Sequence, residues 1–190
     1  MNDNSLRRLR RLSLPFMILL SIALGLVVLV QVPEIVAILF FFHGGDAFHA
    51  AVGSSADGIG LSIWGKDQPP GVALESLSFA QRSILALLAG LCAASGGLAL
   101  FHLRQLFALY SRGVVFAAEN VRHIKHFGLW LVVAAIVVNV SGRVFQIVTG
   151  EPAHGTANAA MALVYGGMTF VVARVMELGR QADQERNEFV

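Results

Sequence analysis

The most prominent pattern along the chain is a set of four long apolar stretches separated by polar segments. A membrane-spanning helix needs about 20 mainly apolar residues to cross a hydrocarbon core about 30 Å thick. Four stretches meet this requirement, although Asn139 and Arg143 interrupt the third and the fourth is the least apolar. The pattern predicts an all-α integral membrane bundle of four transmembrane helices, with spans at residues 14–42, 79–101, 127–148 and 157–175.

The segments outside these spans differ in composition. Residues 43–78 contain seven glycines and the pair Pro69-Pro70, which favours turns and irregular backbone over a packed domain. In residues 102–126 the apolar pattern of the second span continues to Tyr110. This continuation predicts a helix of about 32 residues that protrudes from the membrane as one arm of a helical hairpin. Residues 176–190 form a charged tail without proline, so the fourth helix should continue into it.

The hairpin carries signals for the end of one helix and the start of the next. Gly113 suits the left-handed residue that ends many helices. If Ala117 is the N-cap of the next helix, Phe116 and Val121 occupy the two positions whose apolar side chains form a hydrophobic staple. Glu119 then lies in the first turn, where a carboxylate complements the helix dipole. The next helix should therefore begin just after Ala117.

Composition agrees with a membrane protein, and the distribution of charge predicts its orientation in the membrane. The chain is 56% hydrophobic and 14% charged, whereas soluble domains contain about 25% charged residues. Eleven of the 14 Lys and Arg residues fall in the N-terminal segment, residues 102–126 or the C-terminal end. The positive-inside rule makes that side cytoplasmic. We therefore expect a multi-pass membrane protein with both termini in the cytoplasm.

The N-terminal segment has two further interpretations. Its arginines, followed by an apolar run, resemble a secretory signal peptide, but the run is longer than a signal core and no A-x-A site follows it. The same arginines suit contact with anionic membrane lipids. The net charge of +2 does not indicate direct binding of nucleic acid, since the basic residues lie where topology requires them.

Small residues at four-residue spacing predict close helix contacts. Lipid provides little hydrophobic drive between helices, so small side chains that let two backbones approach are favoured at helix contacts. Such contacts could form within one chain, or between copies of the chain in a homo-oligomer. The residues that show this spacing are Gly90 and Ala94, Ala93 and Gly97, and Ala162 and Gly166.

Polar residues within the spans are candidates for function because they are costly in lipid. Asn139 and Arg143 share a face of the third span, and Glu34 and Arg82 lie at a similar depth on other spans. We define Glu34, Arg82, Asn139 and Arg143 as the candidate intramembrane polar cluster, and we expect Glu34 and Arg143 to approach each other. Alternatively, the two arginines extend to the outer interface and have no further role.

Catalytic and metal-binding patterns are not found in the sequence. None of the six histidines lies in the middle of a span, where an axial haem ligand would be expected, and the single Cys92 lies in an apolar run. There is no G-x-S-x-G, H-E-x-x-H, P-loop or dinucleotide fingerprint. We therefore expect no enzyme activity, no cofactor and no metal site.

Two segments resemble a known family. Residues 103–132, LRQLFALYSRGVVFAAENVRHIKHFGLWLV, are similar to the central signature of domain-of-unknown-function family 2975, small four-span bacterial membrane proteins. The C-terminal VVARVMELGRQADQERNEFV resembles the end of the same family, and together the segments cover about a quarter of the chain. Ala117 departs from the family, in which a Ser or Thr cap is expected, and loss of that hydroxyl costs about 1 kcal/mol. The resemblance implies a location in the bacterial inner membrane. Some members are encoded beside small helix-turn-helix regulators, which makes such a regulator a candidate partner and does not prove one.

The preferred hypothesis is a non-enzymatic membrane protein whose hairpin and tail bind or regulate a cytoplasmic protein. The basic hairpin and the acidic tail should form one surface through weak complementary charges. The alternatives are a small transporter or self-protection protein that uses the polar cluster, and a purely structural lipid-anchored bundle. The candidate partner surface comprises Gly113, Phe116, Glu119, Asn120, Arg122, Lys125, Glu185, Asn187, Phe189 and Val190.

Overall fold

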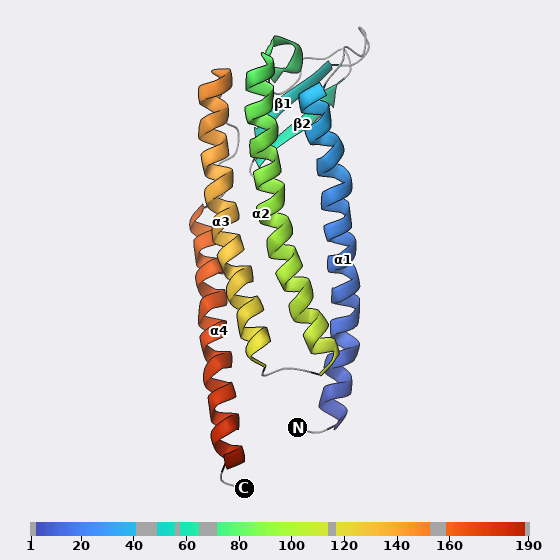
Figure 1. Ribbon diagram of the computed structural model, residues 1–190, viewed down its shortest axis with the longest axis vertical. Helices are drawn as coiled ribbons and strands as arrows, with labels where there is room; N and C mark the ends of the chain where they lie inside the picture. The colour runs from blue at the N-terminus through green and yellow to red at the C-terminus, as the bar shows by residue number, and fades with distance from the viewer. Residues whose placement is uncertain are drawn as a thin grey trace. The chain divides into compact units, whose positions relative to one another are not determined.

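The protein is built mainly from four helices, as its apolar pattern predicts. The structure is a computed structural model that describes residues 3–40, 49–55, 58–64, 72–113, 117–152 and 159–188. Side chains are described for residues 13–40, 72–113, 117–152 and 164–182. In chain order the elements are α1 (Asp3–Phe40), β1 (His49–Ser55), β2 (Gly58–Trp64), β3 (Val72–Ala73), the short 3-10 helix η1 (Leu74–Ser76), α2 (Phe79–Ser111), α3 (Ala118–Thr149) and α4 (Ala159–Glu188), as Figure 1 shows.

Three helices are long and apolar enough to cross a membrane. They are Ser13–Phe40 of α1, Phe79–Ser111 (α2) and Ala118–Thr149 (α3). Only 11% of the most apolar window of α1 is buried within the protein, and large side chains such as Leu29 and Ile22 are exposed along it. Exposed apolar surface on this scale is expected where a helix contacts lipid. The helices therefore indicate a membrane protein.

The predicted ends of α2 and α3 are confirmed. Helix α2 continues to Ser111, and Gly113 follows with a φ of 80°, a conformation that glycine adopts without steric cost. Helix α3 begins at Ala118, immediately after Ala117, whose carbonyl accepts a hydrogen bond from the Asn120 amide. Helix α4 continues to Glu188, so the tail is helical well beyond residue 175.

The start of α2 has a capping box that the sequence-based prediction overlooked. The Ser78 hydroxyl accepts a hydrogen bond from the Gln81 amide at 3.3 Å. In return, Oε1 of Gln81 accepts one from the Ser78 amide at 2.8 Å. This reciprocal pair satisfies two amides that the helix itself leaves without partners.

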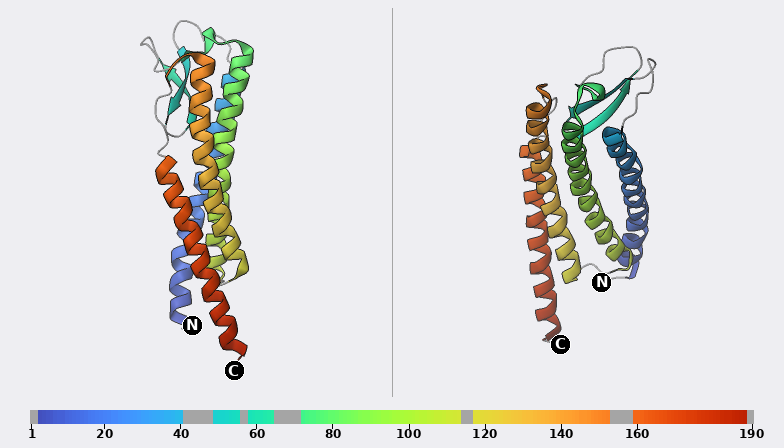
Figure 2. Two further views of the ribbon diagram at one scale, coloured as in Figure 1. Left: turned by 90° about the vertical axis from the view of Figure 1, so that its left-hand side faces the viewer. Right: turned by 45° about the horizontal axis from the view of Figure 1, so that its top comes forward.

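The prediction of irregular backbone across residues 43–78 was wrong. Strands β1 and β2 pair antiparallel from His49↔Trp64 to Ser55↔Gly58, and β3 pairs with the other edge of β1, giving the order β2-β1-β3 (Figures 1 and 2). The glycine count hid the alternation of Ile59, Leu61 and Ile63, which has the period of a strand.

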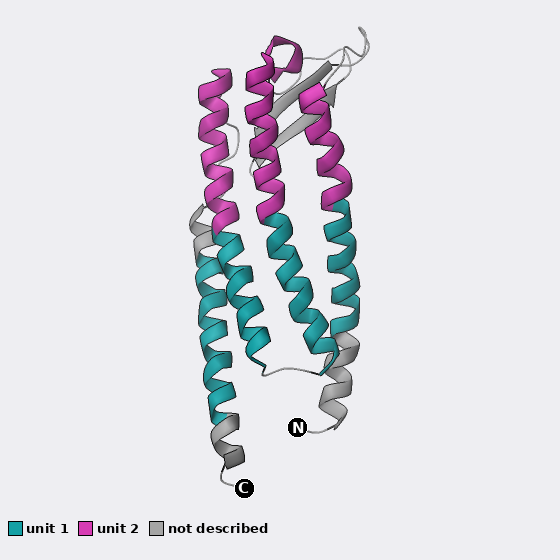
Figure 3. Cartoon of the chain, viewed as in Figure 1, with its two compact units in different colours: residues 1–26, 96–132, 161–190 teal, residues 27–95, 133–160 magenta. Residues whose placement is uncertain are grey.

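The helices contribute to two compact units, coloured separately in Figure 3. Unit 1 comprises residues 1–26, 96–132 and 161–190, and unit 2 comprises residues 27–95 and 133–160. The core of unit 2 gathers buried side chains from α1, η1, α2 and α3. Beside it, the side-chain Nε2 of Gln81 donates to the Val148 carbonyl at 2.8 Å. The buried residues of this core are Ile38, Leu74, Leu77, Leu85, Ala86, Ala89 and Phe145.

The core of unit 1 joins α2, α3 and α4. Leu106 of α2, Val121 and Ile124 of α3, and Ala173 of α4 are buried against one another. In the same unit, α1 contacts α2 through the stacked rings of Phe16 and Phe107 and through the Arg104 Nε, which donates to the Ser21 hydroxyl at 2.7 Å. This core holds the start of α3 and the second half of α4 beside each other.

Candidate functional site

The first turns of α3 carry most of the described residues of the candidate partner surface. Glu119, Arg122 and Lys125 are exposed, as a surface that binds another protein requires. Asn120 is fully buried instead, so it belongs to the interior of unit 1 and not to this surface. The sequence could not distinguish these positions, because the helix face that α4 covers depends on how the two helices pack.

Helix α4 meets α3 beside these residues and completes a cavity of about 350 Å³ within unit 1. Within unit 1, the first half of α3 and α4 lie side by side in Figures 1 and 2. Three cationic side chains and one carboxylate line the cavity. Its lining residues are Ala118, Val121, Arg122, Lys125 and His126 from α3, and Arg174, Glu177 and Gln181 from α4.

The carboxylate at this cavity is already paired within its own helix. Glu177 Oε1 accepts a hydrogen bond from the Arg180 guanidinium at 2.7 Å, one helical turn along α4. This hydrogen bond lowers the pKa of Glu177 below the ordinary value of 4.5, and the positive charges of Lys125 and Arg174 lower it further. Lys125 lies on α3, so a positive charge of the hairpin acts on a carboxylate of α4. That the hairpin and the tail form one partner surface stays a prediction.

The remaining residues of the candidate partner surface are described in part or not at all. Gly113 forms the turn after α2, and its amide donates to the Tyr110 carbonyl at 3.0 Å. Glu185 and Asn187 belong to the helical backbone of α4, but their side chains lie outside the described residues. Phe116, Phe189 and Val190 lie outside them entirely.

A histidine pair links α2 to α3 in unit 1, and the sequence-based prediction did not find it. The Nδ1 atoms of His102 and His123 are 3.2 Å apart, and the His126 ring centroid lies 5.0 Å from that of His102. One Nδ1 must donate and the other accept, so at least one of the two rings is neutral. Within the described residues, no group of three or more His, Cys, Asp or Glu side chains is arranged to hold a metal ion.

The polar cluster of unit 2 is bonded mainly to nearby backbone. Arg82 Nε donates to the Leu77 carbonyl at 3.1 Å, and the Asn139 amide donates to the Ala135 carbonyl of its own helix at 2.8 Å. Glu34 is half-buried on α1, and Arg143 is exposed on α3. These bonds do not join two members of the cluster, and the approach of Glu34 to Arg143 stays a prediction.

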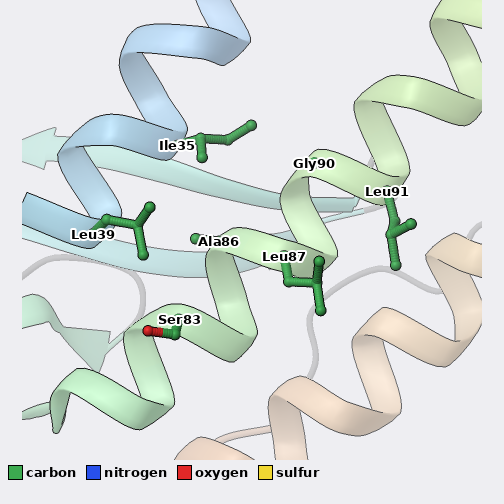
Figure 4. Close-up of a pocket in the computed structure, with 7 residues that line it drawn as sticks. All are labelled: Ile35, Leu39, Ser83, Ala86, Leu87, Gly90 and Leu91. Carbon is green, nitrogen blue, oxygen red and sulfur yellow. The ribbon is translucent and has the colours of Figure 1, made fainter.

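Unit 2 also has an apolar cavity of about 400 Å³ between α1 and α2, shown in Figure 4. Ile35 and Leu39 approach it from α1, and Gly90 of α2 widens it by having no side chain. Ser83 supplies a hydroxyl, which donates to the Phe79 carbonyl of its own helix. A cavity with this lining suits a hydrocarbon chain and offers no group for chemistry.

The cavity between α3 and α4, called the basic cavity below, lies within the part of the chain that matches a protein family. The model of a protein family matches residues 67–189, a range that includes β3, η1, α2, α3 and α4. The chain belongs to the family described as protein of unknown function (DUF2975). The match covers both sides of the basic cavity and every candidate partner-surface residue except Val190, whereas Glu34 lies outside it. No curated protein and no solved structure matches this chain.

Proposed function

We propose that this member of the family is a non-enzymatic protein of the bacterial inner membrane that binds or regulates a cytoplasmic protein. The turn after α2, the first turns of α3 and the second half of α4 form the binding surface. The observation that carries the proposal is the cavity lined jointly by Arg122 and Lys125 of α3 and by Arg174 and Glu177 of α4. Two segments that lie about 50 residues apart in the sequence thus combine into one charged surface.

The proposed topology has four spans with both termini in the cytoplasm. The apolar part of α4 supports the fourth span, because its large side chains are exposed while Gly166 and Ala173 are buried. Such a distribution suits a helix that packs on its neighbour through small residues and faces lipid elsewhere. The exposed side chains are Val164, Tyr165, Met168, Phe170, Val171, Val172 and Val175.

The chemistry of the binding surface favours recognition over catalysis. Exposed Glu119 lies three residues before Arg122 on α3, and residues at this spacing are neighbours on a helix. The surface therefore offers both signs of charge to a partner. Among the described residues that line the cavity, no hydroxyl or thiol accompanies His126, so a nucleophile activated by a base is not assembled there. A helix-turn-helix regulator is the partner class that the family resemblance implies.

Purification of the full chain from membranes in mild detergent tests this proposal. We expect a DNA-binding regulator to co-elute with the unaltered protein and to be lost from the Glu119→Lys variant. Glu151→Lys is the matched control, since Glu151 is also exposed but lies beyond the other end of α3. The same regulator retained by all three proteins, or none recovered with any, would contradict the proposal.

A further inference from the structure

The cavity between α3 and α4 has more positive charge than its own groups neutralise. Arg122, Lys125 and Arg174 face one carboxylate, Glu177, which the Arg180 guanidinium already binds at 2.7 Å. None of the three cations forms a salt bridge with another described residue. Three cations around one concave space repel each other, and an anion that entered the space would relieve this repulsion.

The positions of these residues place the cavity at the edge of the predicted membrane. Residues 118–126 come immediately before the third apolar stretch, and residues 174–181 lie at and just after the end of the fourth. Lipid phosphates lie at this level, just outside the hydrocarbon core. Basic cavities between membrane helices at the headgroup level are typical binding sites for anionic lipids.

The side chains are suited to phosphate in particular. Arg122 and Arg174 each carry a planar fork of donors that matches two phosphate oxygens, and Lys125 adds a compact charge. Gln181 adds a neutral amide to the lining. A volume of about 350 Å³ accommodates a phosphate group with part of its headgroup.

We propose that the cavity formed by Arg122, Lys125, Arg174 and Gln181 binds a phosphate group, presented by an anionic phospholipid in the adjacent leaflet. This inference goes beyond the proposed function, because it concerns a lipid and not a protein partner. It uses part of the same surface, so a bound headgroup would neutralise cations that a partner would otherwise meet. Lipid binding is measured on the purified protein alone, and its failure is therefore distinct from failure of partner binding.

Native mass spectrometry of the purified full chain, titrated with phosphatidylglycerol or with phosphatidylcholine, tests the proposal. We expect phosphatidylglycerol to bind at least tenfold more tightly. Arg122→Gln and Lys125→Gln should each weaken its binding about fivefold, the factor that corresponds to about 1 kcal/mol per basic residue. Arg112→Gln is the matched control, because Arg112 is exposed in the turn after α2 and does not line the cavity.

One substitution should act in the opposite direction. Glu177→Gln removes the negative charge of the carboxylate that lines the cavity, so we expect it to tighten phosphatidylglycerol binding severalfold. General damage to the fold would weaken binding instead, and circular dichroism with gel filtration verifies that each variant is folded. The comparison of the two lipids with the unaltered protein remains valid even if a variant does not fold.

Competition with inorganic phosphate distinguishes the two compounds that could present a phosphate group to the cavity, an anionic phospholipid and a soluble phosphate compound. If millimolar phosphate competes with phosphatidylglycerol and loses this effect in Arg122→Gln, the cavity binds phosphate and the lipid is its source. If phosphate binds at the cavity while the two lipids bind equally, the site serves a soluble phosphate compound. Equal lipid binding without a phosphate effect, or identical losses in Arg112→Gln and Arg122→Gln, would overturn the proposal.

Discussion

Gly128 of α3 lies directly against Thr169 of α4, so closely that a side chain on Gly128 would overlap the Thr169 hydroxyl. That hydroxyl donates to the Gly166 carbonyl at 2.6 Å, and Gly166 itself lies against Val132. The two helices of unit 1 therefore approach through glycines on both sides. The small-residue spacing of the fourth span predicts this use of Gly166, but Gly128, its counterpart on α3, was not predicted.

The Gly128→Ala substitution should destabilise the protein. The new methyl group would force Thr169 away from its hydrogen bond with Gly166, or push the helices apart, and overpacking of this kind costs about 1–3 kcal/mol. Gly167→Ala is the matched control, because open space surrounds its position. Since alanine favours helix by up to about 1 kcal/mol over glycine, the control should be neutral or stabilising. Thermal unfolding in detergent measures both, and equal effects would show that the helices do not meet at Gly128.

The sequence predicts helix boundaries well where a local rule governs them. Gly113 adopts the left-handed conformation because the chain must turn there, and glycine pays no steric cost for it. Helix α3 begins after Ala117 although alanine provides no capping hydroxyl. The apolar contacts of Val121 and Ile124 with α2 and α4 hold this helix end, so packing replaces the missing cap.

Relationships between distant segments could not be predicted from the sequence. His102 and His123 meet because α2 and α3 are antiparallel arms of one hairpin with a particular rotation, which no spacing in either helix encodes. The same rotation buries Asn120 and leaves Glu119 exposed, although the residues are adjacent. The sheet was missed for another reason: glycine content outweighed a strand alternation that was present in β2.

The His102–His123 hydrogen bond should couple α2 to α3. A double-mutant cycle with His102→Gln and His123→Gln should give a coupling of about 0.5–1.5 kcal/mol, because each single variant already removes the same hydrogen bond. The cycle of His102 with His126 is the comparison, since these rings are in contact without sharing a hydrogen bond: the His126 Nδ1 donates to the Arg122 carbonyl of its own helix. Its coupling should be the smaller of the two. Chemical unfolding in detergent measures these couplings. Additive effects of His102 and His123 would show that the hydrogen bond contributes nothing.

Glu177 should titrate at lower pH than an ordinary glutamate. The hydrogen bond from Arg180, then the nearby positive charges, lower the pKa of Glu177 below 4.5 in the folded protein. Because the pKa of Glu177 is lower in the folded protein than in the unfolded protein, the ionised pair stabilises α4 fully at a pH above the unfolded-state pKa. This stabilisation is lost as the pH falls through the folded-state pKa. Carboxyl carbon NMR of the full chain in detergent follows Glu177 directly. Arg180→Gln should raise its pKa towards 4.5, and an unchanged titration in this variant would contradict the prediction.

The proposed topology places the sheet and the C-terminus on opposite sides of the membrane. A reporter inserted in the sheet itself would break the β1–β2 pairing, so the suitable site is between Asp67 and Gln68, in the connection from β2 to β3. We expect a periplasmic signal from this insertion and a cytoplasmic signal from a fusion after Val190.

Between the two sites lie α2, α3 and α4, an odd number of predicted spans. If α4 lay along the membrane surface instead, only two spans would separate the sites and both reporters would give the same signal. A third reporter, inserted after Gly113, distinguishes the cases: it gives the same signal as Val190 if α3 and α4 both cross, and the opposite signal if only α3 crosses.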